Sequence, residues 1–228
     1  ALAAPIARRS PARAAAEKSA TGAFYFVTPP PAGMSAAETE SYLDGFGLAM
    51  LNNISAHEVF PGHFVHLMDI RALSNLSMAR RLNGTRTDGE GWAHYCEQMI
   101  LDEGFGNGDP KLRVAQLMDA LLRDVRYVAG IEMHTRGMSV EQATDMFVKE
   151  AYQPRPIASK EAKRGTSDPT YLYYTVGKLE ILKLRDDWKA KMGAAYSLGE
   201  FHRRLIAAGT VPLKIIRREM MGADGPLL

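Results

Sequence analysis

The fold is decided by the stretch His57-Glu58-Val59-Phe60-Pro61-Gly62-His63. In the common zinc-binding pattern H-E-x-x-H, two histidines four residues apart lie on one face of a helix and bind one metal ion. Here the histidines are six residues apart, and on a regular helix their side chains would point about 120° apart. The two additional residues, Pro61 and Gly62, permit a bulge that brings His63 back beside His57. We therefore expect a zinc site with Glu58 as the general base for its water.

A second group of possible ligands follows in Asp88-Gly89-Glu90-Gly91-Trp92-Ala93-His94-Tyr95-Cys96-Glu97. The spacing of Glu90, His94 and Glu97 places them on one helix face. On an isolated helix this pattern is typical of a solvated polar face. A zinc site needs a third protein ligand and keeps its fourth position for water. Because the chain also contains the His57-Glu58 motif, Glu90, His94 and Glu97 are candidates for the third ligand and for the groups that orient the ligands.

The composition of the 228-residue chain is that of an ordinary globular protein, with 46% hydrophobic and 24% charged residues. The length suits one large domain or one and a half. A net charge of +2 without a basic patch predicts no nucleic-acid partner, and no run approaches the ~20 apolar residues of a membrane helix. Cys96 is the single cysteine, which excludes an internal disulfide. Because the chain begins at Ala1, we expect a processed or truncated product.

Helix signals dominate the chain, and the expected fold is mainly α with one short edge strand. The strand is expected over residues 23–28, where an aromatic and β-branched run precedes three prolines. Residues 1–22, rich in alanine, are expected to form a flexible arm, and residues 23–228 one catalytic domain. One helix is expected from His57 to about Leu73. The three prolines between Gln153 and Pro169 predict a polar loop.

A long helix is expected after Asp109-Pro110, which is a typical cap followed by a first-turn proline. Apolar side chains recur along it three and four residues apart, and Gly137 is its expected end. These side chains belong to Val114, Leu117, Met118, Leu121, Val125 and Val128.

The two ligand motifs resemble those of the bacterial family catalogued as domain of unknown function eight-eighty-five. That family combines an HExxPGH helix with an EGWAxYxE helix, which here are His57–His63 and Glu90–Glu97. Its C-terminal features are matched by Tyr174-Thr175-Val176-Gly177 with Leu184-Arg185, and by Phe201-His202 with Gly209 and Pro212-Leu213. The resemblance covers roughly Phe24 to Met220.

The resemblance implies a helical, gluzincin-like zinc metallopeptidase domain in which Glu90 joins His57 and His63 as the third zinc ligand. It also implies that the N-terminal half usual in the family is missing from this chain. We therefore expect a partner for the missing half, either an N-terminal fragment of the same protein or a second copy. An exported location, periplasmic or secreted, is favoured over a cytoplasmic one.

The chain departs from the family pattern at Phe64, where a second histidine is common, and at His66 and His94, which replace other residue types. A second ligand set therefore stays open, in which His63 and His66 bind the metal from positions i and i+3. His94 is a further residue that could enter the metal site.

Three more side chains are candidates for work on a substrate. Tyr174, which matches the family tyrosine three residues before Gly177, is a candidate donor to the oxyanion, and Gly177 would leave room for the substrate. His134 matches a family histidine and could line the cleft, although a histidine near a helix C-terminus is often a dipole partner. Arg185 could bind a substrate carboxylate bidentately, or serve only in packing.

The expected function is the zinc-dependent hydrolysis of peptide or other small amide bonds. Glu58 would take a proton from the zinc-bound water and pass it to the leaving amine. The alternative is a catalytically silent binding or scaffold module that kept the fold. The presence of Glu58 favours the enzyme, because a general base is readily lost once catalysis no longer matters.

Overall fold

The computed structural model describes residues 24–27, 29–44 and 46–228, and the regular structure in these ranges is helical. The expected mainly α fold is confirmed. The longest helices are α6 (Arg86–Asp102), α7 (Pro110–Thr135) and α10 (Tyr173–Met192). The shorter α-helices are α2 (Ala36–Asp44), α3 (Leu48–Glu58), α4 (His63–Ala72), α5 (Met78–Leu82), α8 (Val140–Glu150), α9 (Arg155–Gly165), α11 (Leu198–Ala207) and α12 (Leu213–Met221). Two 3₁₀ turns, η1 (Phe105–Gly108) and η2 (Gly193–Ala195), follow α6 and α10.

The short strand expected over residues 23–28 is not formed where that segment is described. Residues 24–27 have no regular secondary structure and are exposed. A strand needs the backbone groups of a neighbouring strand as hydrogen-bond partners, and the described ranges contain no strand that could supply them. The segment instead contacts α3, where the Tyr25 hydroxyl lies 3.3 Å from Ser55 Oγ. The arm expected over residues 1–22 lies outside the described residues.

The prediction of a polar loop between Gln153 and Pro169 is also wrong, because most of this segment forms α9. Pro154 is the N-cap of this helix and Pro156 lies in its first turn. Prolines are tolerated there because the first backbone N–H groups of a helix have no partner within it. The prolines therefore mark the start of a helix and not a long loop.

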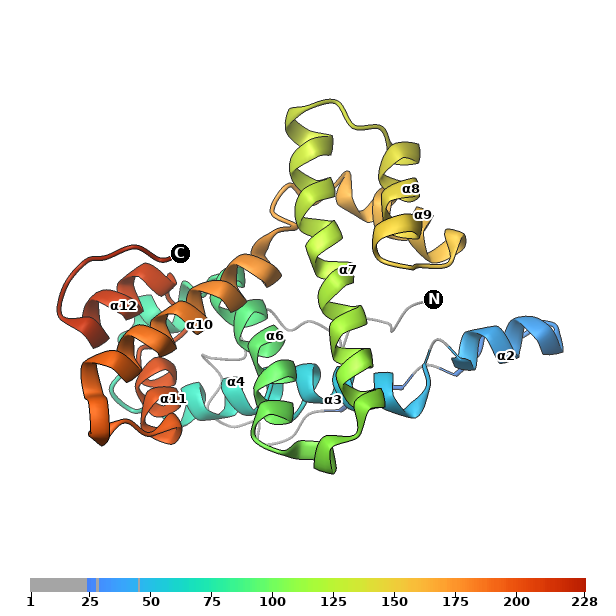
Figure 1. Ribbon diagram of the computed structural model, residues 1–228. Helices are drawn as coiled ribbons and strands as arrows, with labels where there is room; N and C mark the ends of the chain where they lie inside the picture. The colour runs from blue at the N-terminus through green and yellow to red at the C-terminus, as the bar shows by residue number, and fades with distance from the viewer. Residues whose placement is uncertain (1–23, 28, 45) are drawn as a thin grey trace.

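The helices enclose two separate hydrophobic cores. The larger core joins α4, α6, α10, α11 and α12 around Trp92, Ile181 and Phe201. The smaller core joins α7, α8 and α9 around Phe147, and includes Tyr171 from the turn before α10. Figure 1 shows α8 and α9 beside one half of α7, while α10, α11 and α12 lie together at the other side of the molecule. Helices α6, α7 and the start of α10 connect the two cores.

Helices α6 and α10 cross at two glycines and approach so closely that no side chain fits between them. A Cβ atom on Gly177 would lie 1.9 Å from the carbonyl oxygen of Thr87, and one on Gly91 would lie 2.6 Å from the Gly177 backbone. Gly177 is therefore a helix-packing residue, and the expectation that it leaves room for a substrate is wrong. The crossing holds Glu90 and Tyr174, which flank these glycines in sequence, on two tightly joined helices.

One face of α7 is apolar but largely uncovered. Val114, Leu117, Met118 and Val128 are between 40% and 55% exposed, whereas Val125 from the same pattern is buried in the smaller core. Exposed apolar faces of this kind often mark an interaction surface. The expected partner, an N-terminal fragment or a second copy, stays a prediction.

We predict that Gly177→Ala destabilises the protein by about 3 kcal/mol or more, because the new methyl group would overlap backbone atoms of α6. The midpoint of thermal unfolding should fall by roughly 10 °C for a chain of this size. The matched control is Gly199→Ala, since nothing lies within 4 Å of a Cβ at this position in α11. Circular dichroism of both variants tests this, and equal midpoints would show that α6 and α10 do not pack closely.

Candidate metal centre

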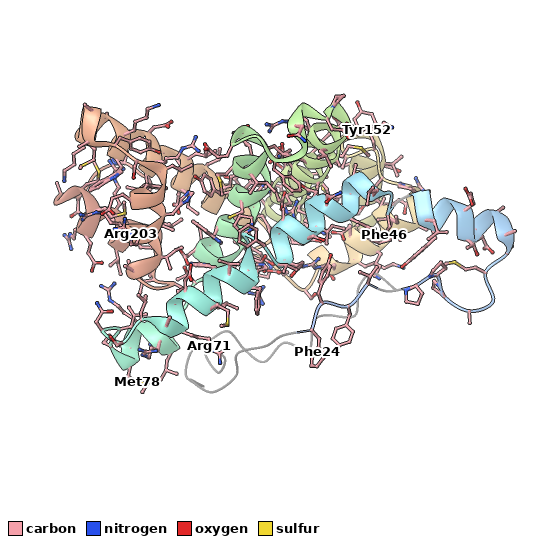
Figure 2. The ribbon with its side chains drawn as sticks, turned by 90° about the horizontal axis from the view of Figure 1, so that it is seen from below. Phe24, Phe46, Arg71, Met78, Tyr152 and Arg203 are labelled. Atoms are coloured by element: carbon pink, nitrogen blue, oxygen red, sulfur yellow. The ribbon has the colours of Figure 1, made fainter. Side chains whose placement is uncertain are left out.

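The stretch between the two histidines divides what was expected to be one helix into two. Helix α3 ends at Glu58 and α4 begins at His63. The backbone N–H of Gly62 donates to the carbonyl of Ala56 over 3.0 Å, and that of Val65 to the carbonyl of Val59 over 3.3 Å. Both bonds span six residues instead of the four of an α-helix, so the insertion interrupts the helix. Figure 2 shows α3 and α4 following one another across the face seen from below, towards Arg71 and Met78.

Gly62 allows the two helix ends to approach each other. A Cβ atom at this position would lie 1.8 Å from the carbonyl oxygen of His57, so no larger residue fits. The close approach places the ring centroids of His57 and His63 4.7 Å apart. The carbonyl of Pro61 accepts a hydrogen bond of 3.1 Å from Trp92 Nε1 on α6. The junction is thereby fixed to the helix that carries the second motif.

Glu90 lies between the two imidazoles. Its Oε2 atom is 3.1 Å from His63 Nε2 and 3.4 Å from His57 Nε2. The possible ligand atoms of the three residues all lie within 4.8 Å of one another. In a tetrahedral zinc site with bonds of 2.0–2.1 Å, ligand atoms are separated by roughly 3.3 Å. The set of two imidazoles and one carboxylate therefore fits zinc in both chemistry and size.

Glu97 orients His57 from the side opposite Glu90. His57 Nδ1 donates to Glu97 Oε1 over 2.6 Å, which directs Nε2 towards Glu90. The Glu97 carboxylate is completely buried and also contacts Arg123 Nη2 at 2.9 Å and His94 Nδ1 at 3.0 Å. A carboxylate that accepts from the second nitrogen of a histidine is the usual support of a metal-binding imidazole.

The charges in the cluster favour a cation at its centre. Burial lowers the pKa of His57, but hydrogen bonds to Glu90 and Glu97 outweigh burial and raise this pKa to about 10. Burial raises the pKa of Glu90, yet its bonds to His57 and His63 hold this pKa well below the usual range. The carboxylates that stabilise a proton on His57 would stabilise a divalent cation for the same reason.

Glu58 and Tyr174 lie beside the three possible ligands. Glu58, at the end of α3, is partly buried, and its carboxylate forms no hydrogen bond or ion pair with the described residues. The Tyr174 ring centroid lies 6.2 Å from that of His57, and the Arg123 guanidinium stacks on the Tyr174 ring at 5.3 Å. The structure thus brings together the three residues expected to bind metal, with Tyr174 beside His57 and with Glu58 next to His57 in the chain.

His134 and Arg185 lie away from this cluster. His134 is close to the end of α7, eleven residues or about 16 Å along the helix from Arg123, and its Nε2 lies 2.9 Å from the Gly165 carbonyl. Arg185 is about 16 Å along α10 from Tyr174, and its Nη1 donates to the Tyr95 hydroxyl over 3.4 Å. The structure therefore does not bring either residue to the substrate position expected for it.

The second ligand set, with His63 and His66, is not assembled. His66 is buried, and its Nε2 lies 3.9 Å from Asp88 Oδ2. Burial lowers the pKa of His66 to about 3, so the imidazole stays neutral. His94 bonds to Glu97 behind His57. Among the described residues, the group that could hold a metal consists of His57, His63 and Glu90.

Sequence reasoning missed Arg123 and Asp119, both on α7. Arg123 Nη1 lies 2.7 Å from Asp119 Oδ2, and Asn53 Nδ2 on α3 donates to the same oxygen over 2.9 Å. Arg123 thereby connects α7 to the histidine helix and, through Glu97, to α6. The available signal was an Asp–Arg pair at i and i+4 on α7.

The fold and the site define a mainly α-helical protein with a His–His–Glu cluster between two cores. The chain belongs to the family described as "Bacterial protein of unknown function (DUF885)", whose model matches residues 3–220.

The structure is similar to two solved proteins. One is described as "a putative lipoprotein of unknown function" from Shewanella oneidensis, with 32% identity, a TM-score of 0.79, and coverage of 88% of this chain and 36% of that one. The other is described as "the putative lipoprotein from Colwellia psychrerythraea", with 29% identity, a TM-score of 0.72, and coverage of 77% and 30%. This chain thus spans about a third of their lengths. No curated protein matches the sequence.

We predict that Glu97→Gln weakens zinc binding by about 10- to 100-fold, because His57 loses the carboxylate that orients its metal-binding nitrogen. The matched control is Glu161→Gln, which replaces another buried carboxylate paired with an arginine but lies outside the cluster. Competition with a zinc-sensitive dye measures both affinities. An unchanged affinity in Glu97→Gln, with the protein folded, would mean that zinc does not bind through His57.

Proposed function

We propose that this chain carries the catalytic centre of a zinc-dependent hydrolase that cleaves peptide or other amide bonds. The observation that carries the proposal is the convergence of His57, His63 and Glu90, whose ligand atoms lie within 4.8 Å of one another, next to Glu58. Zinc in such a site supplies activation of water and polarisation of a carbonyl group. The protein must then supply proton transfer and the binding of the developing negative charge.

Glu58 is the proposed proton carrier. It follows the ligand His57 directly, and its carboxylate has no partner among the described residues that would compete for a proton. In the proposed reaction it accepts a proton from the attacking water and transfers the proton to the nitrogen of the leaving amine. Both transfers use one carboxylate, so no second acid is needed.

Tyr174 is the proposed donor to the oxygen of the scissile carbonyl as it becomes negative. Its ring lies beside His57 and is held from one side by the Arg123 guanidinium. A neutral hydroxyl on a rigid ring is suited to this role. Unlike a cationic side chain, it is not drawn into an ion pair with the ligand carboxylate of Glu90, and it can donate to the substrate oxygen. The neighbouring Tyr173 donates its hydroxyl to Asp168 Oδ2 over 3.2 Å, and its ring centroid lies 4.6 Å from that of Tyr174.

Both similar solved proteins are described as lipoproteins in the words quoted above. We propose on this basis that the present protein is also exported from the bacterial cytoplasm. Fractionation of cells that express the native gene would test this, and recovery in the cytoplasm alone would contradict it. Among the described residues, no helix is long and apolar enough to cross a membrane.

We predict that Glu58→Gln retains zinc affinity within about twofold but lowers hydrolysis by about 10²- to 10⁴-fold, because the amide keeps the shape and cannot accept a proton. Zinc titration and cleavage of a defined peptide mixture, followed by mass spectrometry, measure the two properties. Equal turnover of variant and wild type would refute the role of Glu58. A wild type that binds zinc and cleaves no peptide would favour a silent binding module.

We predict that Tyr174→Phe lowers kcat by about 10²- to 10³-fold, the usual effect of removing an oxyanion donor. Tyr173→Phe is the comparison variant, because it deletes the neighbouring hydroxyl, which donates to Asp168 Oδ2, and we expect it to have a much smaller effect. Steady-state kinetics on one peptide compare the two variants. Small and equal effects would leave Tyr174 with a packing role only.

A further inference from the structure

Two arginines lie beyond Tyr174 on the side of the smaller core. Arg126 on α7 donates through Nε to Glu161 Oε2 over 2.7 Å. Its two terminal nitrogens form no hydrogen bond with the described residues. The side chain is 10% exposed. The terminal nitrogens of Arg126 are not among the fully buried atoms that lack a partner, so they are accessible at the surface. The terminal edge of this guanidinium is therefore the part that a ligand can reach.

The contrast with Arg123, one helical turn earlier, shows that this open edge is unusual. Arg123 contacts the carboxylates of both Glu97 and Asp119, so its charge is balanced within the cluster. Arg126 has one carboxylate partner, Glu161. Glu161 also faces Arg164 on α9, whose side chain forms no hydrogen bond with the described residues. Two positive charges thus share one negative charge, and the pair retains capacity for an anion.

Aromatic rings hold both guanidinium groups in place. The Arg126 guanidinium stacks between two rings, with its carbon 5.5 Å from the Tyr174 centroid and 5.4 Å from that of Tyr171. The Arg164 guanidinium lies 5.4 Å from the same Tyr171 ring. The Tyr171 hydroxyl in turn donates to Glu161 Oε2 over 2.5 Å. Stacking fixes the plane of an arginine and leaves its N–H edge free to bind a carboxylate bidentately.

We propose that Arg126, assisted by Arg164, binds the C-terminal carboxylate of a peptide substrate. The inference rests on the proposed function for the position of the cleaved bond. Tyr174 contacts both the His57 ring and Arg126, which places the guanidinium within about 12 Å of the His57 ring. An extended residue spans about 3.3–3.6 Å, so one or two residues fit between the cleaved bond and the bound carboxylate. The substrate class is then peptides with a free C-terminus, from which one or two residues are released.

The test measures binding, so that it does not depend on catalysis. Acetyl-Ala-Leu and acetyl-Ala-Leu-amide differ only in the charge of their C-terminus. By calorimetry, we expect the wild-type protein to bind the acid at least tenfold more tightly than the amide. We expect the double variant Arg126→Gln, Glu161→Gln to reduce this preference below twofold. Both residues are replaced because removal of Arg126 alone would leave the buried Glu161 without its ion-pair partner.

The matched control is Arg155→Gln, which removes an exposed arginine of α9 that pairs with Asp145 on the surface. It should keep the tenfold preference. Should the double variant fail to fold, Arg164→Gln takes its place, because Arg164 is exposed and its side chain forms no hydrogen bond with the described residues. We expect Arg164→Gln to reduce the preference at least threefold. Equal binding of acid and amide by the wild type, or a preference that survives the substitutions, would overturn the proposal.

Hydrolysis assays separate this inference from the proposed function. A protein that prefers the acid through Arg126 but cleaves no peptide retains the carboxylate site and refutes the hydrolase. A protein that cleaves peptide acids and amides equally retains the hydrolase and refutes the C-terminal anchor. A preference for acetyl-Ala-Glu-amide over acetyl-Ala-Leu would also refute the anchor, because it would assign the arginines to an acidic side chain.

Discussion

The buried carboxylate of Glu97 constrains the site from three helices at once. It contacts His57 from α3, Arg123 from α7 and His94 from its own helix α6. Burying a carboxylate away from water destabilises the folded protein unless opposite charges and hydrogen-bond donors surround it. Removing one partner of such a buried pair lowers the stability by about 3–5 kcal/mol. Three helices must therefore hold their positions together for Glu97 to be tolerated. The orientation of His57 towards Glu90 is a result of that requirement.

Backbone contacts supply the rigidity that this polar cluster needs. Gly62 brings the end of α3 against the start of α4, and Gly91 and Gly177 bring α6 against α10. Because each approach excludes a side chain, a helix cannot slide without backbone overlap. The imidazoles, the Glu90 carboxylate and the Tyr174 ring are thus placed by main-chain geometry, and side-chain hydrogen bonds only set their final orientation. Sites built on regular elements are held more precisely than sites built on loops.

The residues of the candidate site were predictable from the His-Glu…His motif and from the resemblance to a family pattern, which supplied Glu90 as the third ligand and Tyr174 as the donor. The sequence indicated His57, His63, Glu90 and Tyr174, which the structure places together, and Glu58, which follows His57 at the end of α3. Their chemical roles remain predictions. The form of the break between the histidines was not predictable, since a bulge within one helix and two successive helices both return His63 to His57. The positions of His134 and Arg185 depend on how long helices cross, which periodicity alone does not fix.

The fold was predicted at the level of class and less well in detail. The long apolar pattern of α7 correctly indicated a helix, but Leu117 and Met118 lie at the surface. Periodicity identifies an apolar face without showing which part of it another element will cover. Phe24 and Val27 have side chains typical of a strand, yet a strand also needs a partner that propensity cannot supply. The prolines around Arg155 were read as loop residues because the same residues occur in loops and in the first turn of a helix.

The division of the interior into two cores has a thermodynamic consequence. Among the described residues the two cores have no apolar side chain in common, and the charged cluster lies where α6, α7 and α10 meet. Each core can therefore unfold locally as a cooperative unit, and the charged cluster lies at the boundary between the two units. A cation bound by the cluster at this boundary would stabilise the folded form of both units by mass action. Occupancy of the site and the opening of each core would then be linked, and amide hydrogen exchange is the observable that reports this linkage.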